Sequence, residues 1–192
     1  MPVKGRHGKG TLLIWASGNG GGNDDDCGAD GYASHQHIFS IGSINHLGKT
    51  TNFDERCPST IAVVYSGGQH SKTGDKDVLE VGVVSTDVGG GCTTTFFGTS
   101  GAAPVAAGAL AIVLEANPAL TYRDVMHVIA KTARIPTLAE WDGWTINGAG
   151  YHVNDKFGFG VLDVGRMTAL AQNWTNVPPR YECYREYRGG SR

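Results

Sequence analysis

The sequence feature that most constrains the fold is a run of small residues that leads into a long apolar segment. Residues 97–104 read Phe-Gly-Thr-Ser-Gly-Ala-Ala-Pro, and apolar residues occupy every face of a helix over 105–116. This pattern predicts a tight turn followed by a central, buried helix, with Pro104 in the first turn, where proline is tolerated. Ser100 would then lie at the helix N-terminus, where the helix dipole and backbone N–H groups stabilise a developing negative charge.

A second stretch supports a reactive site. Residues 11–16 form a short apolar run that suits a buried strand, and Gly-Asn-Gly-Gly follows it at 18–21. The flexible loop would aim the amide of Asn19, and a serine nucleophile with an amide donor makes half of an acyl-transfer site. Taken alone, Ser100 is more often a turn residue or cap, and Asn19 a loop residue that bonds its own backbone.

Composition narrows the class of protein. The chain has 192 residues, 40% of them hydrophobic, so it is long enough to bury a core, and one domain is expected. Its net charge of -2 argues against a partner such as nucleic acid or a membrane surface. We expect no transmembrane segment and no signal peptide, because no apolar run reaches about 18 residues and the first residues lack an apolar core.

The sequence leaves open whether the cysteines form disulfides and whether the acidic residues at 24–26 bind a cation. Four widely spaced cysteines without a zinc pattern favour disulfides or free thiols: Cys27, Cys57, Cys92 and Cys183. The consecutive acids at 24–26 repel one another unless a cation lies among them, but a solvated acidic loop explains them equally well. An EF-hand is excluded, because the twelfth position from Asp24 is His35. The triplet Asn173-Trp174-Thr175 is a glycosylation sequon, although such triplets often arise by chance.

The remaining elements follow from periodicity and turn signals. Thr121 and Asp124 resemble a capping box that opens a helix to about Ala130. Strands are expected at 38–44, 61–65 and 81–85, and a last helix at 164–173. An exposed loop is expected at 66–77, a Gly-rich loop at 88–92, and a loop or hairpin at 141–153.

The sequence motifs around Ser100 and Asn19 also resemble those of a known protein family. Gly98-Thr99-Ser100 followed by small residues, together with Ala-Ser-Gly-Asn-Gly-Gly at 16–21, resembles the subtilisin-like serine proteases. Flanking words narrow the resemblance to the kexin/furin proprotein convertases: Asp-Gly-Tyr at 30–32, Leu-Glu-Ala-Asn at 114–117, Tyr-Arg-Asp-Val-Met-His at 122–127 and Phe-Gly-Phe-Gly-Val-Leu-Asp at 157–163.

The resemblance implies an α/β fold, an incomplete subtilisin-like domain with a mostly parallel sheet flanked by helices. It implies a partial peptidase S8 catalytic domain at 10–178 and a tail at 179–192 that leads towards an absent domain. Residues 1–9 are basic and Gly-rich, which indicates a linker or an artificial start. Gly101 departs from the family, which usually has alanine after the serine, so the turn that positions Ser100 should be looser.

The resemblance also implies residue roles. Ser100 would be the nucleophile, and Asn19 would donate to the oxyanion of the tetrahedral intermediate. Asp30 would be a buried carboxylate that pairs with an arginine of the substrate, beside a substrate-binding strand end at Ala16, Ser17 and Gly18. Tyr32 would line a more distant subsite.

A metal and disulfides are implied in the same way. Asp25 and Glu55 would bind calcium together with a third acid upstream, since hard oxygen ligands suit calcium. Cys27 would pair with Cys57, whereas the partners of Cys92 and Cys183 would lie outside the chain.

The family's catalytic Asp and His motifs are not found. His7 precedes a glycine as the family histidine does, but it lies too close to Asn19 and its neighbours differ. The expected function is therefore that of a calcium-dependent serine endopeptidase of the secretory pathway that cuts precursor proteins after paired basic residues, with this chain alone inactive. Two alternatives stay open: a truncated product or pseudoprotease that acts as a binding protein, and an acidic-loop calcium-binding module.

Overall fold

The computed structural model describes residues 5–68, 81–136, 143–181 and 183. The strands are β1 (Leu13–Ala16), β2 (Ile38–Ile44), β3 (Thr60–Tyr65), β4 (Val83–Thr86), β5 (Cys92–Phe96), β6 (Thr145–Ile146) and β7 (His152–Val153). The helices are α1 (Thr99–Ala116), α2 (Tyr122–Thr132) and α3 (Val164–Gln172), with short 3-10 turns η2 (Arg6–Gly8), η3 (Gly21–Asn23), η4 (Cys27–Ala29) and η5 (Val88–Gly90). The α/β class and the strand predicted at 38–44 are confirmed.

A parallel sheet with the order β1-β2-β3 forms the centre of the fold. β2 lies between its two neighbours and is buried on both faces, whereas the sequence predicted only a strand here, from its alternation. The expectation of a buried strand at 11–16 is wrong in one respect. β1 pairs only with β2 within the described sheet, so it is an edge strand, and Leu13 and Trp15 are 39% and 44% exposed.

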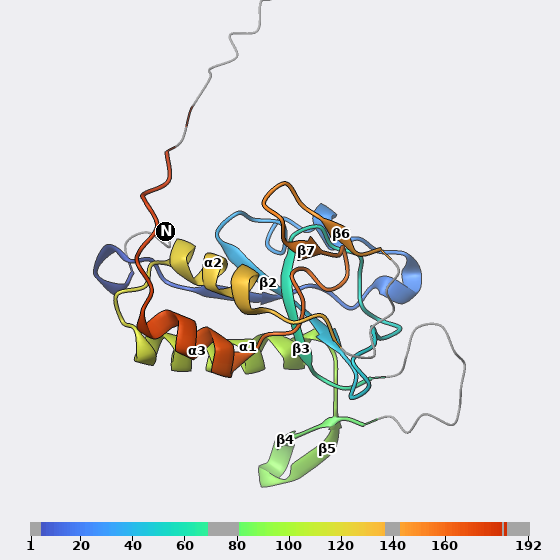
Figure 1. The fold of residues 1–192 in the computed structure, drawn as a ribbon. Coiled ribbons are helices and arrows are strands. Elements are labelled where there is room, and N and C mark those ends of the chain that lie inside the picture. The colour runs from blue at the N-terminus through green and yellow to red at the C-terminus, as the bar shows by residue number, and fades with distance from the viewer. Residues whose placement is uncertain (1–4, 69–80, 137–142, 182, 184–192) are drawn as a thin grey trace, which may run out of the picture.

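The two faces of the sheet pack against different material. Phe39 and Ile41 of β2 point to one face, where they form the main core with side chains of α1, α2 and α3. Ile44 points to the other face and packs with Phe157. The described helices α1, α2 and α3 therefore cover a single face (Figure 1), and the segment that carries β6 and β7 lies over the other.

Helix α1 begins earlier than predicted. Its first residue is Thr99, so Pro104 lies in the second turn and removes one interior hydrogen bond. The helix is also not buried on every face, because Val105 and Ile112 are 46% and 50% exposed. It packs through one side only, on β1, β2 and α3. In the described part of the chain, α1 alone is long and apolar enough to cross a membrane, a test that core helices also pass.

Helix α2 has the predicted capping box. Thr121 Oγ1 accepts from the N–H of Asp124, and the Asp124 carboxylate accepts in return from the N–H of Thr121. The segment after α3 is fixed to the same carboxylate, because Trp174 Nε1 and the N–H of Val177 donate to its second oxygen. We call residues 174–177 the C-terminal strap.

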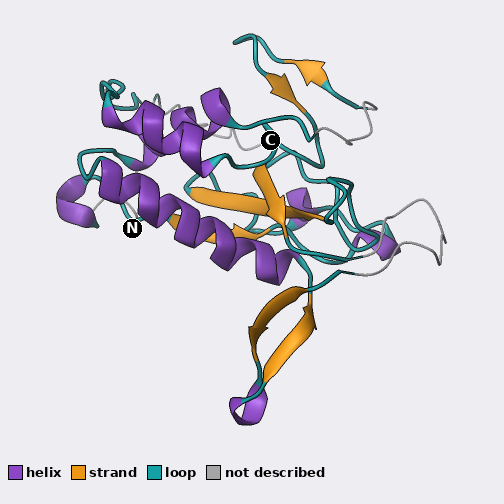
Figure 2. Ribbon diagram, turned by 60° about the horizontal axis from the view of Figure 1, so that its bottom comes forward, coloured by secondary structure: helices purple, strands orange, loops and turns teal. Residues whose placement is uncertain are grey.

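Two antiparallel hairpins complete the fold. β4 and β5 form a ribbon that projects from the body, with η5 at its tip (Figure 2). The sequence predicts β4 but not β5, since a Gly-rich loop was expected up to Cys92. The hairpin expected within 141–153 is present as β6–β7. The exposed loop expected at 66–77 is wrong for Ser66, which is fully buried; residues 69–77 lie outside the described residues.

Candidate active site

The loop after β1 meets the start of α1 through hydrogen bonds. Asn19 Oδ1 accepts from the backbone N–H of Thr99 at 3.0 Å and from Thr99 Oγ1 at 2.9 Å. Because the oxygen is used in this way, the Asn19 amide NH₂ is left as the donating end of the side chain. Ser100 follows Thr99 and is exposed at the second position of the helix. The structure thus brings the predicted nucleophile and amide together.

The turn before α1 is fixed by the conformation of Gly98 and by a hydrogen bond from Ser66. Gly98 has φ 110°, a conformation that favours glycine, and Ser66 Oγ donates to its carbonyl at 2.7 Å. A Cβ at Gly101 would lie 2.5 Å from Ser66 Oγ and 3.0 Å from the Phe96 ring. A side chain at position 101 would therefore clash with Ser66 and Phe96, which explains the glycine after Ser100. The same two residues support the turn that was expected to be looser.

An acidic cavity adjoins this turn. Its volume is about 310 Å³, and its lining comes from the end of β1, the η4 region and the turn before β3: Trp15, Ala16, Ser17, Gly18, Asp25, Asp26, Ala29, Asp30 and Glu55. Gly18 also donates its N–H to Thr99 Oγ1 at 3.3 Å, which links the cavity to the start of α1. All the predicted substrate and metal residues except Tyr32 line it. Tyr32 is 66% exposed and stacks on Trp15, with ring centroids 5.0 Å apart.

Asp30 differs from expectation in its burial. The buried carboxylate predicted here is wrong, since Asp30 is exposed at the surface of the cavity. Its Oδ1 accepts from the N–H groups of Tyr32 and Ala33, both at 2.7 Å. The two bonds fix the carboxylate and use the same oxygen, so Oδ2 is available to a cationic ligand.

Asp25 and Glu55 both lie next to Gly20. A Cβ at Gly20 would lie 2.7 Å from Asp25 Oδ2 and 3.1 Å from Glu55 Oε1, so both carboxylates approach one point. Glu55 is buried and also accepts from the N–H of Gly20 at 2.7 Å. Two adjacent carboxylate oxygens fit calcium as part of a ligand set, but calcium takes about six to eight oxygens. No group of three or more His, Cys, Asp or Glu side chains that suits a metal is found among the described residues.

A disulfide joins Cys27 to Cys57, whose Cα atoms are 5.0 Å apart. Next to it, Asp26 and Arg56 form a parallel backbone bridge. The disulfide expected from the resemblance is therefore present, and it connects the acidic loop to the turn that carries Glu55. Cys92 and Cys183 are free and exposed within the described chain.

Sequence reasoning overlooked Asp54, which lies beside Glu55. Burial raises the pKa of its carboxyl to about 6, against the hydrogen bonds from Thr51 and Ser43, which favour the charged form. With Asp24, Asp25 and Asp26 it lines a second small cavity of about 280 Å³. The available signal was the polar, turn-rich sequence at 52–58, but nothing in it distinguishes a partly buried acid from a solvated one.

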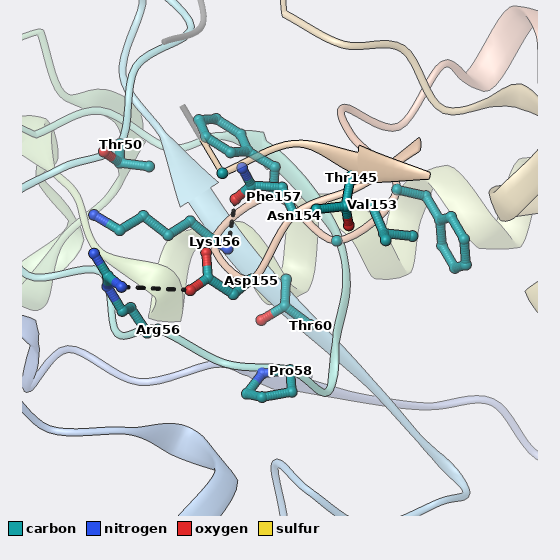
Figure 3. A pocket seen from close by; sticks show the side chains of 13 residues that line it. Thr50, Arg56, Pro58, Thr60, Thr145, Val153, Asn154, Asp155, Lys156 and Phe157 are labelled. Carbon is teal, nitrogen blue, oxygen red and sulfur yellow. Dashed lines mark hydrogen bonds and ion pairs between the residues drawn. The ribbon is translucent and has the colours of Figure 1, made fainter. Parts of the chain in front are cut away.

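A larger cavity of about 710 Å³ lies elsewhere, between the β6–β7 hairpin and the turn before β3. Arg56 and Asp155 form an ion pair at 3.7 Å at its side (Figure 3). Neither Ser100, Asn19 nor Asp30 lines it. The larger cavity therefore does not coincide with the candidate site, which is defined by hydrogen bonding and charge instead.

Comparisons with known proteins show which family the chain belongs to. Residues 2–160 match the model of the subtilase family, Peptidase_S8. The chain is 45% identical to neuroendocrine convertase 2 of Drosophila melanogaster over 94% of its own length and 27% of that protein. It is 42% identical to furin of Mus musculus over 94% of its length and 22% of that protein.

Among solved structures, the serine protease of Aeromonas sobria shares the fold, with a TM-score of 0.77 and 20% identity over 89% of this chain and 38% of that one. The chain thus spans about a quarter of the curated relatives that it matches. It belongs to the subtilase family, and the relatives named here confirm the expected kinship with the proprotein convertases.

Proposed function

We propose that this chain forms part of the catalytic domain of a calcium-dependent serine endopeptidase that cuts precursor proteins after paired basic residues. The observation that carries the proposal is the pair of hydrogen bonds from Thr99 to Asn19 Oδ1, at 3.0 and 2.9 Å. They hold a carboxamide beside an exposed serine at a helix N-terminus, which is the arrangement that acyl transfer requires. Residues 10–178 would be the part of the domain contained here, and 179–192 would lead towards a further domain.

In the proposed reaction, Ser100 Oγ attacks the scissile carbonyl while a base takes its proton. Within the described residues no hydrogen bond joins Ser100 to a histidine, so the base and the carboxylate that orients it would come from a part of the protein outside this sequence. The carbonyl oxygen gains negative charge, and Asn19 Nδ2 would donate to it. Loss of one such donor typically lowers the rate about 10²- to 10³-fold.

Asp30 would select the side chain that precedes the cut. Its carboxylate is fixed by two N–H groups and faces the cavity next to Gly18, one residue from Asn19. A guanidinium or ammonium group in the cavity would pair with Asp30 and be attracted by Asp25 and Glu55, whereas a neutral side chain would leave the carboxylates without a partner.

Asp25 and Glu55 would hold calcium below this subsite together with ligands from outside the described residues. The ion's charge would offset the mutual repulsion of the two carboxylates. Glu55 also fixes Gly20 next to Asn19, so its position links the ion to the loop that carries the amide. The protein would act in the secretory pathway, where its substrates would be precursor proteins with basic cleavage sites.

The test uses the full-length protein and matched fluorogenic peptides that end in Lys-Arg or in Lys-citrulline, a neutral isostere. We expect calcium-dependent cleavage of the first only. Ser100→Ala should abolish it, and Asn19→Ala should lower kcat about 10²- to 10³-fold with little change in KM. Unchanged turnover in Ser100→Ala would refute the proposal. Binding of the Lys-Arg peptide without turnover by the wild-type protein would favour the alternative, a binding protein without catalytic activity.

A further inference from the structure

The sequon at 173–175 is a feature that the proposed reaction does not use. It is the single Asn-X-Ser/Thr triplet in the sequence. The structure places it directly after α3, where Asn173 is the C-cap residue of the helix. Asn173 and Thr175 are exposed, and no side-chain hydrogen bond of Asn173 occurs with the described residues.

The middle residue fixes the direction of the triplet. Trp174 is half-buried against the main core, and its Nε1 donates to the fully buried Asp124 at 2.9 Å. The following Val177 donates to the same oxygen at 2.7 Å. Because the indole is held inward, the neighbouring amide and hydroxyl of the triplet lie on the solvent side.

We propose that Asn173 is an N-glycosylation site of this protein. The Asn173 amide nitrogen would form a bond to the anomeric carbon of a lipid diphosphate-linked oligosaccharide in the secretory pathway. The bond between that carbon and the diphosphate oxygen breaks, the lipid diphosphate leaves with the electron pair, and the amide proton goes to solvent. Thr175 supplies the hydroxyl that the sequon requires.

The position of the glycan is compatible with the candidate active site. Asn117, the C-cap of α1, donates through Nδ2 to the carbonyl of Ala171 at 2.8 Å, so α3 ends beside the C-terminal end of α1. Figure 1 shows α3 lying along α1. Ser100 lies at the opposite end of this 18-residue helix, about 26 Å from Asn117 along the helix axis at the rise of an α-helix. A glycan on Asn173 therefore leaves the acidic cavity open and covers the side of the fold where the strap lies.

The experiment directs the full 192-residue chain into the endoplasmic reticulum of cultured cells with a cleavable signal sequence. We expect one glycan, removed by peptide N-glycosidase, with mass spectrometry placing the resulting Asn-to-Asp conversion at position 173. Asn173→Gln and Thr175→Ala should each abolish the modification, whereas Thr175→Ser should keep it. Asn176→Gln, a change at a neighbouring exposed asparagine outside any sequon, should have no effect.

A positive control makes a negative result decisive. Ala149→Thr gives an acceptor triplet to the half-buried Asn147, in the turn between β6 and β7 whose residues 148–150 are exposed, and reports that the chain has reached the transferase. Modification at Asn147 in this variant while Asn173 stays unmodified would overturn the inference. None of these readouts depends on proteolysis, so failure here leaves the proposed function untouched, and failure of the peptide assay leaves this site untouched.

Discussion

Two sets of carboxylates in this chain have opposite surroundings. Asp124 is fully buried, and both its oxygens accept from groups of the chain itself: Thr121 on one side, Trp174 and Val177 on the other. Asp30, Asp25 and Glu55 line a cavity, and Asp30 uses only one oxygen internally in the described structure. A carboxylate whose oxygens are all used internally stabilises the fold, whereas one that keeps an oxygen towards a cavity is available to a cation.

The difference is also visible in acid–base behaviour. Burial alone would raise the pKa of Asp124, but hydrogen bonds from Thr121, Trp174 and Val177 outweigh it and lower the pKa below the ordinary value of 3.8. At Asp54, beside the cavity residues, burial wins over its hydrogen bonds and the pKa rises to about 6. The balance between burial and the hydrogen bonds that favour the charged form therefore decides the direction of each shift.

The largest effect is expected at Asp30, the cavity carboxylate that we propose contacts the substrate. In the full-length protein, Asp30→Asn keeps an oxygen for the N–H groups of Tyr32 and Ala33 but removes the charge. We expect kcat/KM for an arginine peptide to fall about 30-fold, corresponding to about 2 kcal/mol, the lower end for a lost charge pair because Asp30 is exposed. Asp87→Asn, at a turn carboxylate that caps Val88 far from the cavity, is the control. An equal loss for arginine and citrulline peptides would contradict a role in charge selection.

The next effect concerns calcium. Glu55→Gln keeps an acceptor for the N–H of Gly20 and removes one of the two adjacent charges. Changes outside the direct ligands already cost about 10- to 100-fold in metal affinity, so we expect at least a tenfold loss. The measurement is the calcium-dependent rise in Tm of the full-length protein, with Glu115→Gln on the exposed side of α1 as control. An unchanged calcium-dependent rise in Tm in the Glu55→Gln variant would show that Glu55 does not bind the metal.

At the internally satisfied carboxylate, the expected change is in stability and its pH dependence. Asp124→Asn leaves donors facing an NH₂ group, which should cost about 1–3 kcal/mol in the free energy of unfolding at pH 7. Because the folded pKa is lowered, this stabilisation is present above pH 3.8 and is lost as the pH falls through the folded value. Urea titrations of wild type and variant between pH 7 and pH 2.5 should therefore converge at low pH. If the free energies of unfolding of wild type and variant differ by the same amount at every pH in that range, the charge of Asp124 is not the source of the stabilisation.

Local patterns in the sequence were sufficient for several of these elements. The capping box at Thr121 and Asp124 and the existence of the strand Ile38–Ile44 follow from the spacing of residue types, since caps and strand alternation are local patterns. The meeting of Asn19 with the start of α1 was inferred from family resemblance, because nothing local relates positions eighty residues apart.

Other features depend on tertiary contacts and were not predictable. The hydrogen bonds that the strap donates to Asp124, the bond from Ser66 to the Gly98 carbonyl, and the exposure of Asp30 all arise from segments that meet only after folding. β5 was missed because its Thr-rich sequence lacks an apolar alternation and is stabilised by pairing with β4. Sequence therefore predicts which carboxylates exist near the site, but only the fold separates those that face a ligand from those used internally.

The smallest effect is expected at a carboxylate intermediate between the two sets. Asp163 caps α3 through Oδ1, which accepts from the N–H of Arg166 at 2.9 Å, and its Oδ2 contacts Arg134 Nε at 2.8 Å. The Arg134 side chain is 66% exposed, so solvent screens the pair.

Arg134→Gln should lower the free energy of unfolding by no more than about 0.2–1 kcal/mol, and the difference should vanish in 1 M salt. Asp163→Asn keeps a capping oxygen and should match it, whereas Asp163→Ala should cost about 1 kcal/mol more through loss of the cap. If Arg134→Gln and Asp163→Ala lower the free energy of unfolding equally at every salt concentration, the capping hydrogen bond contributes nothing to stability. Asp163 would then belong with the carboxylates that depend on a cation, here the guanidinium of Arg134.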